Sequence, residues 1–544
     1  MTRYCIALDI GTSGLRCQAI DLDTMETLAS SITQRHPIPG MNVIDHVNFA
    51  MKNGVESATG LLLNAINALF KTLNVDLSKV EHLGVCGNPF QLSLFQGIEI
   101  RDLAYAGKNM LIDLGVEPPK RDGAVLSAAE VGLEGMPNAM VTIPPAVRHE
   151  IGADAMAMLL MTDALSETEP CIVADYGTNA EMALIHDGKI ITGSAAAGPA
   201  LEGQEIERGM LASPGAISDV NVTSEGWVCT VLDETMAPRE GDTVDPKTGK
   251  VVKEGPMHGK AIGITGTGVV AALYCGLKTG LIVPPKIDTE DGKMHLQDGI
   301  DITPRDIEEA GKAIGALRAG FLTLLDEAGM WTGDIKKTYM SGASGLYVDA
   351  KKALSIGMVV PGVNDIVQFG NTSIGLARKV ATGEMDLEEL REMAKKLRAD
   401  HCMFATSEIF KDIYSIEFSL WVQNMPMSEY NNMLAVYNIP PIPDPDENPT
   451  VKRITERDLP DTEKIPVFVL DNPGTMLRGI IEGCIFCRKC ERVCPEGAIK
   501  ITDEDDGRYA NIRTDLCGGY ACGRCERECP QRVLIYKSLK ITEE

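Results

Sequence analysis

The sequence predicts an α/β protein that ends in a small, cysteine-rich α+β module. Over residues 1 to about 380, short apolar strands alternate with longer segments of helical spacing. Eight of the 15 cysteines lie between Cys484 and Cys529. A chain of 544 residues is long enough for about two to four domains, and a hydrophobic fraction of 44% can build large cores.

Two strands and two helices define the predicted α/β part. The segments Cys5 to Ile10 and Cys171 to Tyr176 are apolar, as expected of buried strands, and each carries an aspartate near its end. The segments Val47 to Leu73 and Thr303 to Ala328 have helical spacing, and the second begins with Thr-Pro, a typical helix start.

A helical bridge and a proline-rich linker are expected after the α/β part. Helical spacing continues over Met385 to Leu397 and Phe404 to Tyr414. The next segment is rich in proline, which excludes regular helix and predicts a semi-rigid, extended spacer, with a loop packed over a neighbouring domain as the alternative. Lys464 to Leu470 is expected to be a strand that leads into the cysteine-rich module. The predicted divisions are an α/β domain over 1–380, a bridge over 381–437, a linker over 438–466 and the module over 467–544.

The clustered cysteines form two runs with nearly the same spacing. The first run is Cys-x2-Cys-x2-Cys-x3-Cys-Pro and the second is Cys-x4-Cys-x2-Cys-x3-Cys-Pro. This spacing is typical of ferredoxin modules that hold two [4Fe-4S] clusters, in which the fourth cysteine of each run binds the cluster of the other run. We therefore predict that one cluster is held by Cys484, Cys487, Cys490 and Cys529, and the other by Cys517, Cys522, Cys525 and Cys494.

A zinc ribbon and a disulfide framework are the competing interpretations of these cysteines. Zinc sites use pairs of ligands separated by a long loop, whereas here four thiols lie within eleven residues and Cys-Pro closes each run. Disulfides require an oxidising compartment.

The four-residue gap Gly518 to Ala521 in the second run departs from the regular pattern of cysteine spacing. We expect it to reshape the loop over one cluster and change the solvent access of that cluster.

The charge and hydropathy of the chain exclude several kinds of partner. A net charge of −26 repels phosphate backbones and anionic membrane surfaces, so neither a nucleic acid nor a membrane is expected as a partner. No apolar run is long enough to cross a bilayer. Because the expected strand Tyr4 to Ile10 is not preceded by a basic segment and a long apolar stretch, we predict a cytoplasmic protein.

A repeated motif marks the second candidate site. The sequence Ala-Leu-Asp-Ile-Gly-Thr-Ser-Gly at residues 7–14 recurs as Val-Ala-Asp-Tyr-Gly-Thr-Asn-Ala at residues 173–180, each time where a strand turns tightly into another. Glycine lets the backbone approach a phosphate, hydroxyl and N–H groups donate to its oxygens, and aspartate can hold hydrated Mg²⁺. The candidate residues are Asp9, Gly11, Thr12 and Ser13 in the first loop and Asp175, Gly177, Thr178 and Asn179 in the second.

A third glycine-rich turn, Met340 to Gly345, follows a short expected strand. Close backbone approach at Gly342 and Gly345 would suit a purine and its ribose, although an ordinary strand-to-helix turn has the same composition. The chain contains no Gly-x4-Gly-Lys-[Ser/Thr] motif, and the run Gly266 to Gly268 lacks the third glycine of a dinucleotide fingerprint. Neither a P-loop nor a Rossmann site is supported.

Together the three turns resemble those of the superfamily that contains acetate and sugar kinases, Hsp70 and actin. The resemblance implies an ATPase domain of two ribonuclease-H-like lobes with ATP between them. Three further stretches, Ser194 to Gly203, Gly263 to Gly268 and Gly370 to Ser373, are similar to those of reductive activators of corrinoid-dependent methyltransferases. A C-terminal module with two clusters resembles the activators that serve methylamine methyltransferases in methanogens. The chain departs from the family pattern at Tyr176 and Ala180 in the second phosphate loop, and at Thr267.

The resemblance implies an ATP-dependent reduction of a corrinoid protein from Co(II) to Co(I), with electrons supplied by a low-potential donor. It implies that Asp9 and Asp175 position Mg²⁺ and the attacking water. The implied phosphate ligands are Thr12, Ser13, Thr178 and Asn179, and Gly342 and Gly345 would accommodate adenosine.

Two alternative functions remain open from the sequence. An ATP-dependent activator of a 2-hydroxyacyl-CoA dehydratase or of a benzoyl-CoA reductase system joins the same ATPase fold to iron-sulfur chemistry, but such chains are much shorter and share one cluster between two subunits. An electron-carrier scaffold whose lobes only dock a partner is the non-enzymatic alternative. The presence of both Asp9 and Asp175 argues against the scaffold.

Overall fold

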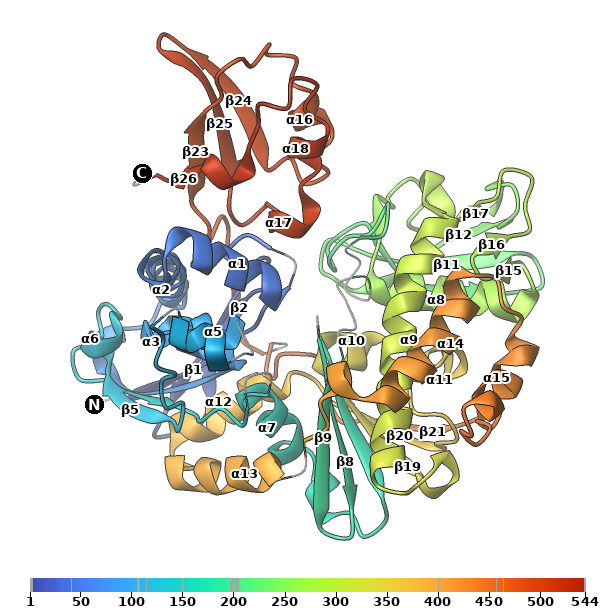
Figure 1. Ribbon diagram of the computed structural model, residues 1–544, viewed down its shortest axis with the longest axis horizontal. Coiled ribbons are helices and arrows are strands. Elements are labelled where there is room, and N and C mark those ends of the chain that lie inside the picture. The colour runs from blue at the N-terminus through green and yellow to red at the C-terminus, as the bar shows by residue number, and fades with distance from the viewer. Residues whose placement is uncertain are drawn as a thin grey trace. The chain divides into compact units, whose positions relative to one another are not determined.

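The computed structural model describes the chain except for short gaps, and it divides into two compact units. The described residues are 3–40, 42–104, 108–113, 115–148, 151–177, 179–195, 200, 205–399, 401–455, 457–462 and 464–542. The first unit comprises Met1–Ala157, Ser373–Lys395 and Asp461–Glu544, and the second comprises Met158–Thr372 and Lys396–Pro460. Each unit contains a large mixed β-sheet flanked by helices (Figure 1).

The first unit contains a seven-stranded sheet in the order β22-β3-β2-β1-β4-β6-β5. Its strands are β1 (Tyr4–Ile10), β2 (Leu15–Asp21), β3 (Thr27–Thr33), β4 (Val80–Gly87), β5 (Ala124–Ser127), β6 (Met140–Ile143) and β22 (Val467–Leu470). Its helices are α1 (Val43–Asn53), α2 (Val55–Thr72), α3 (Pro89–Gln96), α4 (Arg101–Ala104), α5 (Lys108–Asp113) and α6 (Ala128–Val131). Three further helices, α7 (Ala153–Leu160), α12 (Thr372–Thr382) and α13 (Leu387–Ala399), lie at the boundaries between the units in sequence.

The second unit contains a six-stranded sheet in the order β21-β20-β19-β7-β8-β9 and a five-stranded sheet in the order β13-β12-β11-β10-β14. The strands of the larger sheet are β7 (Cys171–Tyr176), β8 (Ala180–His186), β9 (Lys189–Ala195), β19 (Lys337–Ser341), β20 (Asp365–Gln368) and β21 (Thr450–Arg453). The smaller sheet is formed by β10 (Ala216–Val222), β11 (Trp227–Leu232), β12 (Pro238–Val244), β13 (Val251–Lys253) and β14 (Gly263–Ile264). Two short pairs are β15 (Ile282–Val283) with β16 (Lys286–Ile287), and β17 (Met294–His295) with β18 (Asp301–Ile302). The helices are α8 (Gly266–Thr279), α9 (Pro304–Glu327), α10 (Gly342–Tyr347), α11 (Ala350–Ile356), α14 (Glu408–Val422) and α15 (Tyr430–Val436).

The two large sheets repeat one strand pattern. In the first sheet β3, β2 and β1 are antiparallel neighbours, and β1 then pairs in parallel with β4 and β4 with β6. In the second sheet β9, β8 and β7 are antiparallel neighbours, and β7 pairs in parallel with β19 and β19 with β20. The motif repeated in the sequence therefore lies at the equivalent strand-to-strand turn of two similar sheets.

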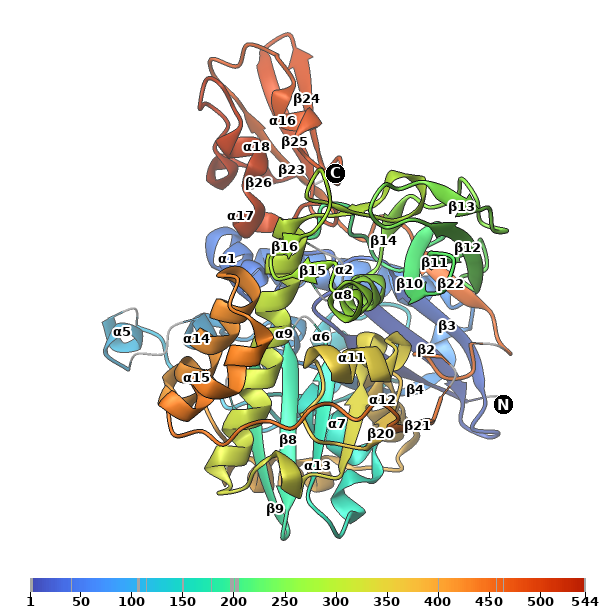
Figure 2. The same ribbon diagram turned by 90° about the vertical axis from the view of Figure 1, so that its right-hand side faces the viewer.

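The cysteine-rich module is an α+β element of the first unit. Its four-stranded sheet has the order β24-β25-β23-β26 and is seen with its short helices in Figure 2. The strands are β23 (Met476–Ile480), β24 (Ile499–Glu504), β25 (Gly507–Arg513) and β26 (Lys540–Ile541), and the helices are α16 (Lys489–Arg492), α17 (Gly519–Cys522) and α18 (Arg524–Arg527). The predicted α/β class with an α+β cysteine-rich module is thus confirmed.

The predicted strands and long helices are found, with two differences in extent. β1 and β7 match the expected segments, and α9 begins after the N-cap Thr303, whose side chain accepts from Asp306 N. The expected single helix over Val47 to Leu73 is instead α1 and α2, because Gly54 lies between them with a φ of 89°. The expected strand over Lys464 to Leu470 is shorter, and it pairs with β3 rather than with the sheet of the module.

The segments expected to form a bridge and a linker are integrated into the sheets and the core. α14 packs along α9, as both views show (Figures 1 and 2), and Gly311 and Gly315 permit this contact, since a Cβ atom there would lie 2.5 Å from Trp421 and 2.7 Å from Glu417. A buried ion pair between Arg318 and Glu417 also joins the two helices. The expected proline-rich spacer contains β21, which extends the second sheet by pairing in parallel with β20. The chain there is extended, as predicted, but it is bound to a domain instead of spanning freely between two.

Within the described ranges, no helix is both long enough and apolar enough to cross a membrane.

Candidate functional site

The first phosphate loop joins β1 to β2, and the side chains of Arg16 and Asn88 contact it. Asp9 is 4% exposed, and its Oδ2 lies 3.5 Å from Nη1 of Arg16. Asn88, the N-cap of α3, donates from Nδ2 to Oγ1 of Thr12 at 3.2 Å. A Cβ atom at Gly11 would lie 3.0 Å from the carbonyl oxygen of Gly14, so a larger residue would crowd the turn. Thr12 and Ser13 are partly exposed and can reach a ligand.

Asp154 is a second carboxylate of this site that the sequence analysis missed. It lies in the first turn of α7. Its pKa is raised to about 6, mainly by burial and in addition by the negative charge of Asp9. Two carboxylates that oppose each other's ionisation are a suitable pair for a divalent cation. The sequence around Asp154 is an ordinary helix start, and only the folded chain brings it to Asp9.

The second phosphate loop joins β7 to β8 and centres on Asp175. In the sheet Asp175 is paired with Glu181 of β8 on one side and with Ser341 of β19 on the other. The hydroxyl of Thr372 lies 3.4 Å from Asp175 Oδ2. Gly177 N donates to the carbonyl oxygen of Asn179 at 3.1 Å, which closes the turn, while Thr178 lies outside the described residues.

The glycine-rich turn at Gly342 lies against Asp175 in the same unit. Gly342 has a φ of 81°, and a Cβ atom there would lie 2.6 Å from Asp175 Oδ1. Glycine is therefore required both by the backbone conformation and by the carboxylate next to it. The structure thus brings two of the three predicted turns together, which is the arrangement that a nucleotide bound by both would need.

Tyr176, which departs from the family pattern, packs against the glycine-rich turn at Gly345. Its ring is buried, its hydroxyl donates to the carbonyl oxygen of Met358 at 3.0 Å, and a Cβ atom at Gly345 would lie 3.1 Å from its Cδ2. Gln368 Nε2 donates to the carbonyl oxygen of Gly345 at 2.7 Å. The tyrosine therefore packs against α10, and its hydroxyl is held by the backbone at Met358.

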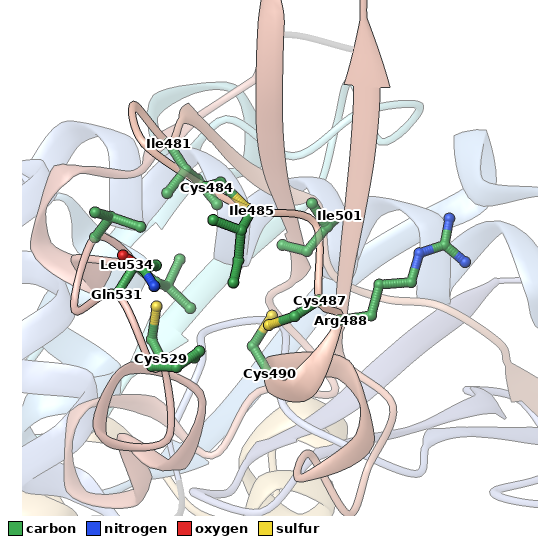
Figure 3. Close-up of a pocket in the computed structure, with 12 residues that line it drawn as sticks. Ile481, Cys484, Ile485, Cys487, Arg488, Cys490, Ile501, Cys529, Gln531 and Leu534 are labelled. Atoms are coloured by element: carbon green, nitrogen blue, oxygen red, sulfur yellow. The ribbon is translucent and has the colours of Figure 1, made fainter.

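Four cysteines from both runs line one cavity of the module. Figure 3 shows Cys484, Cys487 and Cys490 of the first run turned toward the same cavity as Cys529 of the second run. Ile481, Ile485, Ile501 and Leu534 supply an apolar wall around the thiols. Four soft donors in a small apolar cavity fit an iron-sulfur cluster, and this set is the one that the crossed assignment predicts.

The remaining four cysteines also lie together. Burial, together with the negative charges of Cys517, Cys522 and Cys494, raises the pKa of Cys525 to about 12. Burial likewise raises the pKa of Cys517 to about 11, again with contributions from Cys522 and Cys494. Charge interactions of this kind act between neighbouring groups, so these four thiols lie near one another, as the ligands of one cationic metal centre would.

Tyr536 is a neighbour of the second cysteine set that can tune a bound cluster. It is 4% exposed, and its hydroxyl lies 3.6 Å from Sγ of Cys517. Burial raises the pKa of Tyr536, so the phenol stays protonated and donates when the sulfur is a thiolate. Hydrogen bonds to cluster sulfurs raise reduction potentials.

We expect Tyr536→Phe to lower the midpoint potential of the second cluster by about 20–60 mV, because a one-electron couple shifts ~59 mV per tenfold change in equilibrium. The measurement is an EPR-monitored redox titration. Tyr509→Phe, in the sheet of the same module, is the matched control, since its hydroxyl bonds the carboxylate of Asp506 instead of a cysteine. Equal potentials in wild type and Tyr536→Phe would contradict the assignment.

A buried histidine pair joins the segment after β3 to α1. The rings of His36 and His46 stack with their centroids 4.3 Å apart, and both residues are buried. His36 Nδ1 accepts from Ile38 N at 3.1 Å, and Gln91 Nε2 lies 2.8 Å from His46 Nδ1. Burial lowers the pKa of His36 to about 3 and that of His46 well below its usual value, so both rings are neutral in the folded protein.

The neutral pair makes the stability of the protein pH-dependent. The unfolded chain binds a proton at His36 below pH about 6.5 and the folded chain does not, so stability falls as the pH drops through that value. We expect His36 alone to contribute a loss of about 2 kcal/mol between pH 7.5 and pH 5. In His36→Gln this part of the loss should disappear, whereas His82→Gln, at an exposed position, should keep it. Chemical denaturation at the two pH values measures the difference, and identical pH slopes in wild type and His36→Gln would disprove it.

Comparisons with known protein families agree with this geometry. Residues 4–166 match the model described as the RACo middle region, and residues 169–431 match the C-terminal domain of RACo, described as the ASKHA domain. Residues 483–533 match a 4Fe-4S dicluster domain. The predicted actin- and sugar-kinase-like ATPase fold and the iron-sulfur character of the module are therefore confirmed.

Individual relatives show to which family the whole chain belongs. The "[Co(II) methylated amine-specific corrinoid protein] reductase" of Methanosarcina barkeri is 48% identical over 541 residues, which covers 99% of each chain. The corrinoid activation enzyme RamQ of Eubacterium limosum is 25% identical over 65% of this chain and 60% of its own. Among solved structures, a reductive activator for a corrinoid, iron-sulfur protein superposes with a TM-score of 0.63 at 25% identity, covering 76% of this chain and 66% of that one. The chain thus belongs to the family of the reductive activators of corrinoid proteins.

Proposed function

We propose that this protein reduces the cobalt of a methylamine-specific corrinoid protein from Co(II) to Co(I), using ATP and two [4Fe-4S] clusters. The observation that carries the proposal is the presence, in one chain, of phosphate loops built around Asp9 and Asp175 and of two cysteine sets that each combine both runs. The match over 99% of the chain to a reductase of methylated amine-specific corrinoid proteins supports the substrate class and a role in methanogenesis from methylamines.

The phosphate loops are proposed to bind and hydrolyse ATP. Asp9, assisted by Asp154, and Asp175 would hold a hydrated Mg²⁺ and orient the attacking water. Thr12, Ser13, Thr178 and Asn179 would donate to phosphate oxygens, with Gly11 and Gly177 allowing the backbone to approach. Gly342 and Gly345 would leave room for adenosine. The contact of Gly342 with Asp175 supports this division of roles, because it places the turn for the nucleoside next to the carboxylate that serves the phosphates.

The cysteine sets are proposed to carry electrons. Cys484, Cys487, Cys490 and Cys529 would hold one cluster, and Cys517, Cys522, Cys525 and Cys494 the other; bound there, the clusters accept and release single electrons at low potential. The apolar wall formed by Ile481, Ile485, Ile501 and Leu534 limits water around the first set. Reduced, unpaired thiols are stable in the cytoplasm, where we place the protein.

The reaction is a balanced one-electron transfer. One electron leaves a low-potential donor, passes through the module and converts Co(II) of the partner to Co(I), while one water and ATP yield ADP and phosphate. Because reduction to Co(I) is unfavourable with common cellular donors, ATP hydrolysis supplies the difference through a change of conformation.

The test is an anaerobic assay with the purified corrinoid protein and a strong artificial reductant. Wild-type protein carrying about eight iron atoms per chain should form Co(I), seen in the visible spectrum, only when MgATP is present. A colourless protein that binds zinc would overturn the redox assignment. ATP binding without hydrolysis, together with undiminished Co(I) formation, would favour a docking scaffold.

A further inference from the structure

A series of contacts with a buried middle part connects the first phosphate loop with the second cysteine run inside the first unit. At the phosphate end, Asn88 Nδ2 donates to Thr12 Oγ1 at 3.2 Å, and Asn88 Oδ1 accepts from Gln91 N at 2.9 Å. A ligand that accepts from the Thr12 hydroxyl polarises and orients that group, and so acts on the bond between Thr12 and Asn88, the N-cap of α3. The first turn of α3 is the start of the connection.

Gln91 continues the connection from α3 to α1. Its side chain is fully buried, and its Nε2 bonds His46 Nδ1 at 2.8 Å. His46 stacks on His36, which lies on the segment that follows β3. Because every one of these groups is buried, a displacement of Gln91 cannot be absorbed by solvent and must move the two rings or break the bond.

The last step reaches the module through two glycines. Gly40 has a φ of 142°, and a Cβ atom there would lie 3.0 Å from His46 Cδ2. Gly40 N donates to the carbonyl oxygen of Cys517 at 3.0 Å. Gly519 has a φ of 70°, and a Cβ atom there would lie 2.9 Å from Gly40 Cα. The segment Gly518 to Ala521, which departs from the regular cysteine spacing, thus provides the surface of α17 that meets the lobe, by which we mean the seven-stranded sheet of the first unit and its helices. α17 lies beside α1 of this lobe in both views (Figures 1 and 2).

Other contacts hold the module against the same face of the lobe. Lys52 of α1 donates to the carbonyl oxygens of Tyr536 and Leu539, each at 3.1 Å, and lies over the rings of Tyr520 and Tyr536. Tyr536 in turn contacts Cys517. A shift of α1 therefore acts on the second cysteine set from two sides.

We propose that Gln91 and the His36–His46 pair are positioning residues that transmit nucleotide binding at Thr12 to the second cluster, the one assigned to Cys517, Cys522, Cys525 and Cys494. This inference rests on the proposed function and adds the route of the coupling. It also assigns a role to the longer spacing between Cys517 and Cys522, which is to place Gly519 in contact with Gly40. It further gives a role to the polar Gln-His-His group in the interior of the first unit, since an apolar trio would pack there without the hydrogen bond that links α3 to α1.

The first test replaces Gln91 by methionine, which keeps the size of the side chain and removes both polar groups. Two readouts are needed: ATP-dependent Co(I) formation, and hydrogen-deuterium exchange at the Gly40 amide with a non-hydrolysable ATP analogue. In wild type, nucleotide should slow exchange at Gly40. In Gln91→Met that response should vanish and Co(I) formation should fall about tenfold, within the range of coupling between sites, while iron content and ATP hydrolysis stay within about twofold. Gln96→Met, on the same helix, should behave as wild type, because the side chain of Gln96 donates to the carbonyl oxygen of Leu92 within α3.

The second test acts on the cluster end and does not depend on the stability of the lobe interior. Gly519→Ala places a Cβ atom against Gly40, whereas at Gly523, with a φ of 48°, the nearest atom to a new Cβ is the mobile end of Arg527 at 3.1 Å. Both substitutions strain the backbone in the same way. Only Gly519→Ala should alter the EPR signal of the second cluster on nucleotide addition and lower ATP-dependent Co(I) formation.

The outcomes separate the route from the function. A Gln91→Met protein that retains both the Gly40 response and Co(I) formation overturns the route, as does equal behaviour of Gly519→Ala and Gly523→Ala. The exchange measurement needs no corrinoid protein. If wild type forms no Co(I) with ATP, the proposed function is wrong, while the response of Gly40 to nucleotide still decides whether the connection exists.

Discussion

Asp175→Asn is expected to reduce Mg²⁺-dependent ATP hydrolysis and corrinoid activation by at least about 100-fold, the size of effect seen when a group that stabilises a transition state is removed. The substitution keeps the shape of the side chain and removes the charge that would hold Mg²⁺. Both clusters should still assemble and be reducible by dithionite, since all eight cysteines lie in the other unit.

The matched control for this prediction is Asp187→Asn. Asp187 lies at the turn between β8 and β9 of the same sheet, its side chain is 95% exposed, and asparagine tolerates its φ of 47°. The control should hydrolyse ATP at the wild-type rate. If Asp175→Asn also does so, the phosphate loop of the second unit does not carry the reaction.

The crossed ligation of the clusters is expected to appear in the iron content of paired cysteine variants. Cys494→Ser and Cys522→Ser should each reduce iron from about eight to about four atoms per chain, because each removes a ligand of the second set. The double variant should lose no more than either single one. Combining Cys494→Ser with Cys487→Ser should remove nearly all the iron, since the two then damage different clusters.

Uncrossed ligation predicts the reverse pattern, in which Cys494 and Cys487 act together and Cys494 and Cys522 act independently. Cys402→Ser serves as the control, because Cys402 lies in the other unit and its Sγ faces Glu327. Iron and sulfide analysis of the anaerobically purified proteins decides between the two patterns.

The parts of this protein that the sequence predicts are those in which local chemistry decides the structure. Cysteine spacing predicts two thiol sets because a cluster requires ligands at short, fixed separations, and the structure brings the expected cysteines together. The Asp-x-Gly-Thr repeat predicts two equivalent loops because each follows a buried strand, as β1 and β7 show. The cap and Pro304 start of α9 are likewise local signals.

The features that the sequence analysis missed depend on contacts between distant segments. Asp154 lies in an apolar helix, and only the folded chain brings it near the charge of Asp9. Strand β21 is short and exposed, and it lies between Pro449 and Pro460 in the sequence. Its composition therefore does not predict that it pairs with the edge of the second sheet. The Gln91–His46 contact joins residues 45 positions apart and has no periodic signal.

The most direct test of the account follows Co(II) to Co(I) conversion by visible spectroscopy under anaerobic conditions, with cluster-loaded wild type and Asp175→Asn, each with MgATP or a non-hydrolysable analogue. The account predicts Co(I) only for wild type with MgATP, while both proteins show the same reduced cluster signal. Co(I) formed at the wild-type rate with the analogue, or by Asp175→Asn, would contradict the claim that ATP hydrolysis at the phosphate loops drives the electron to cobalt.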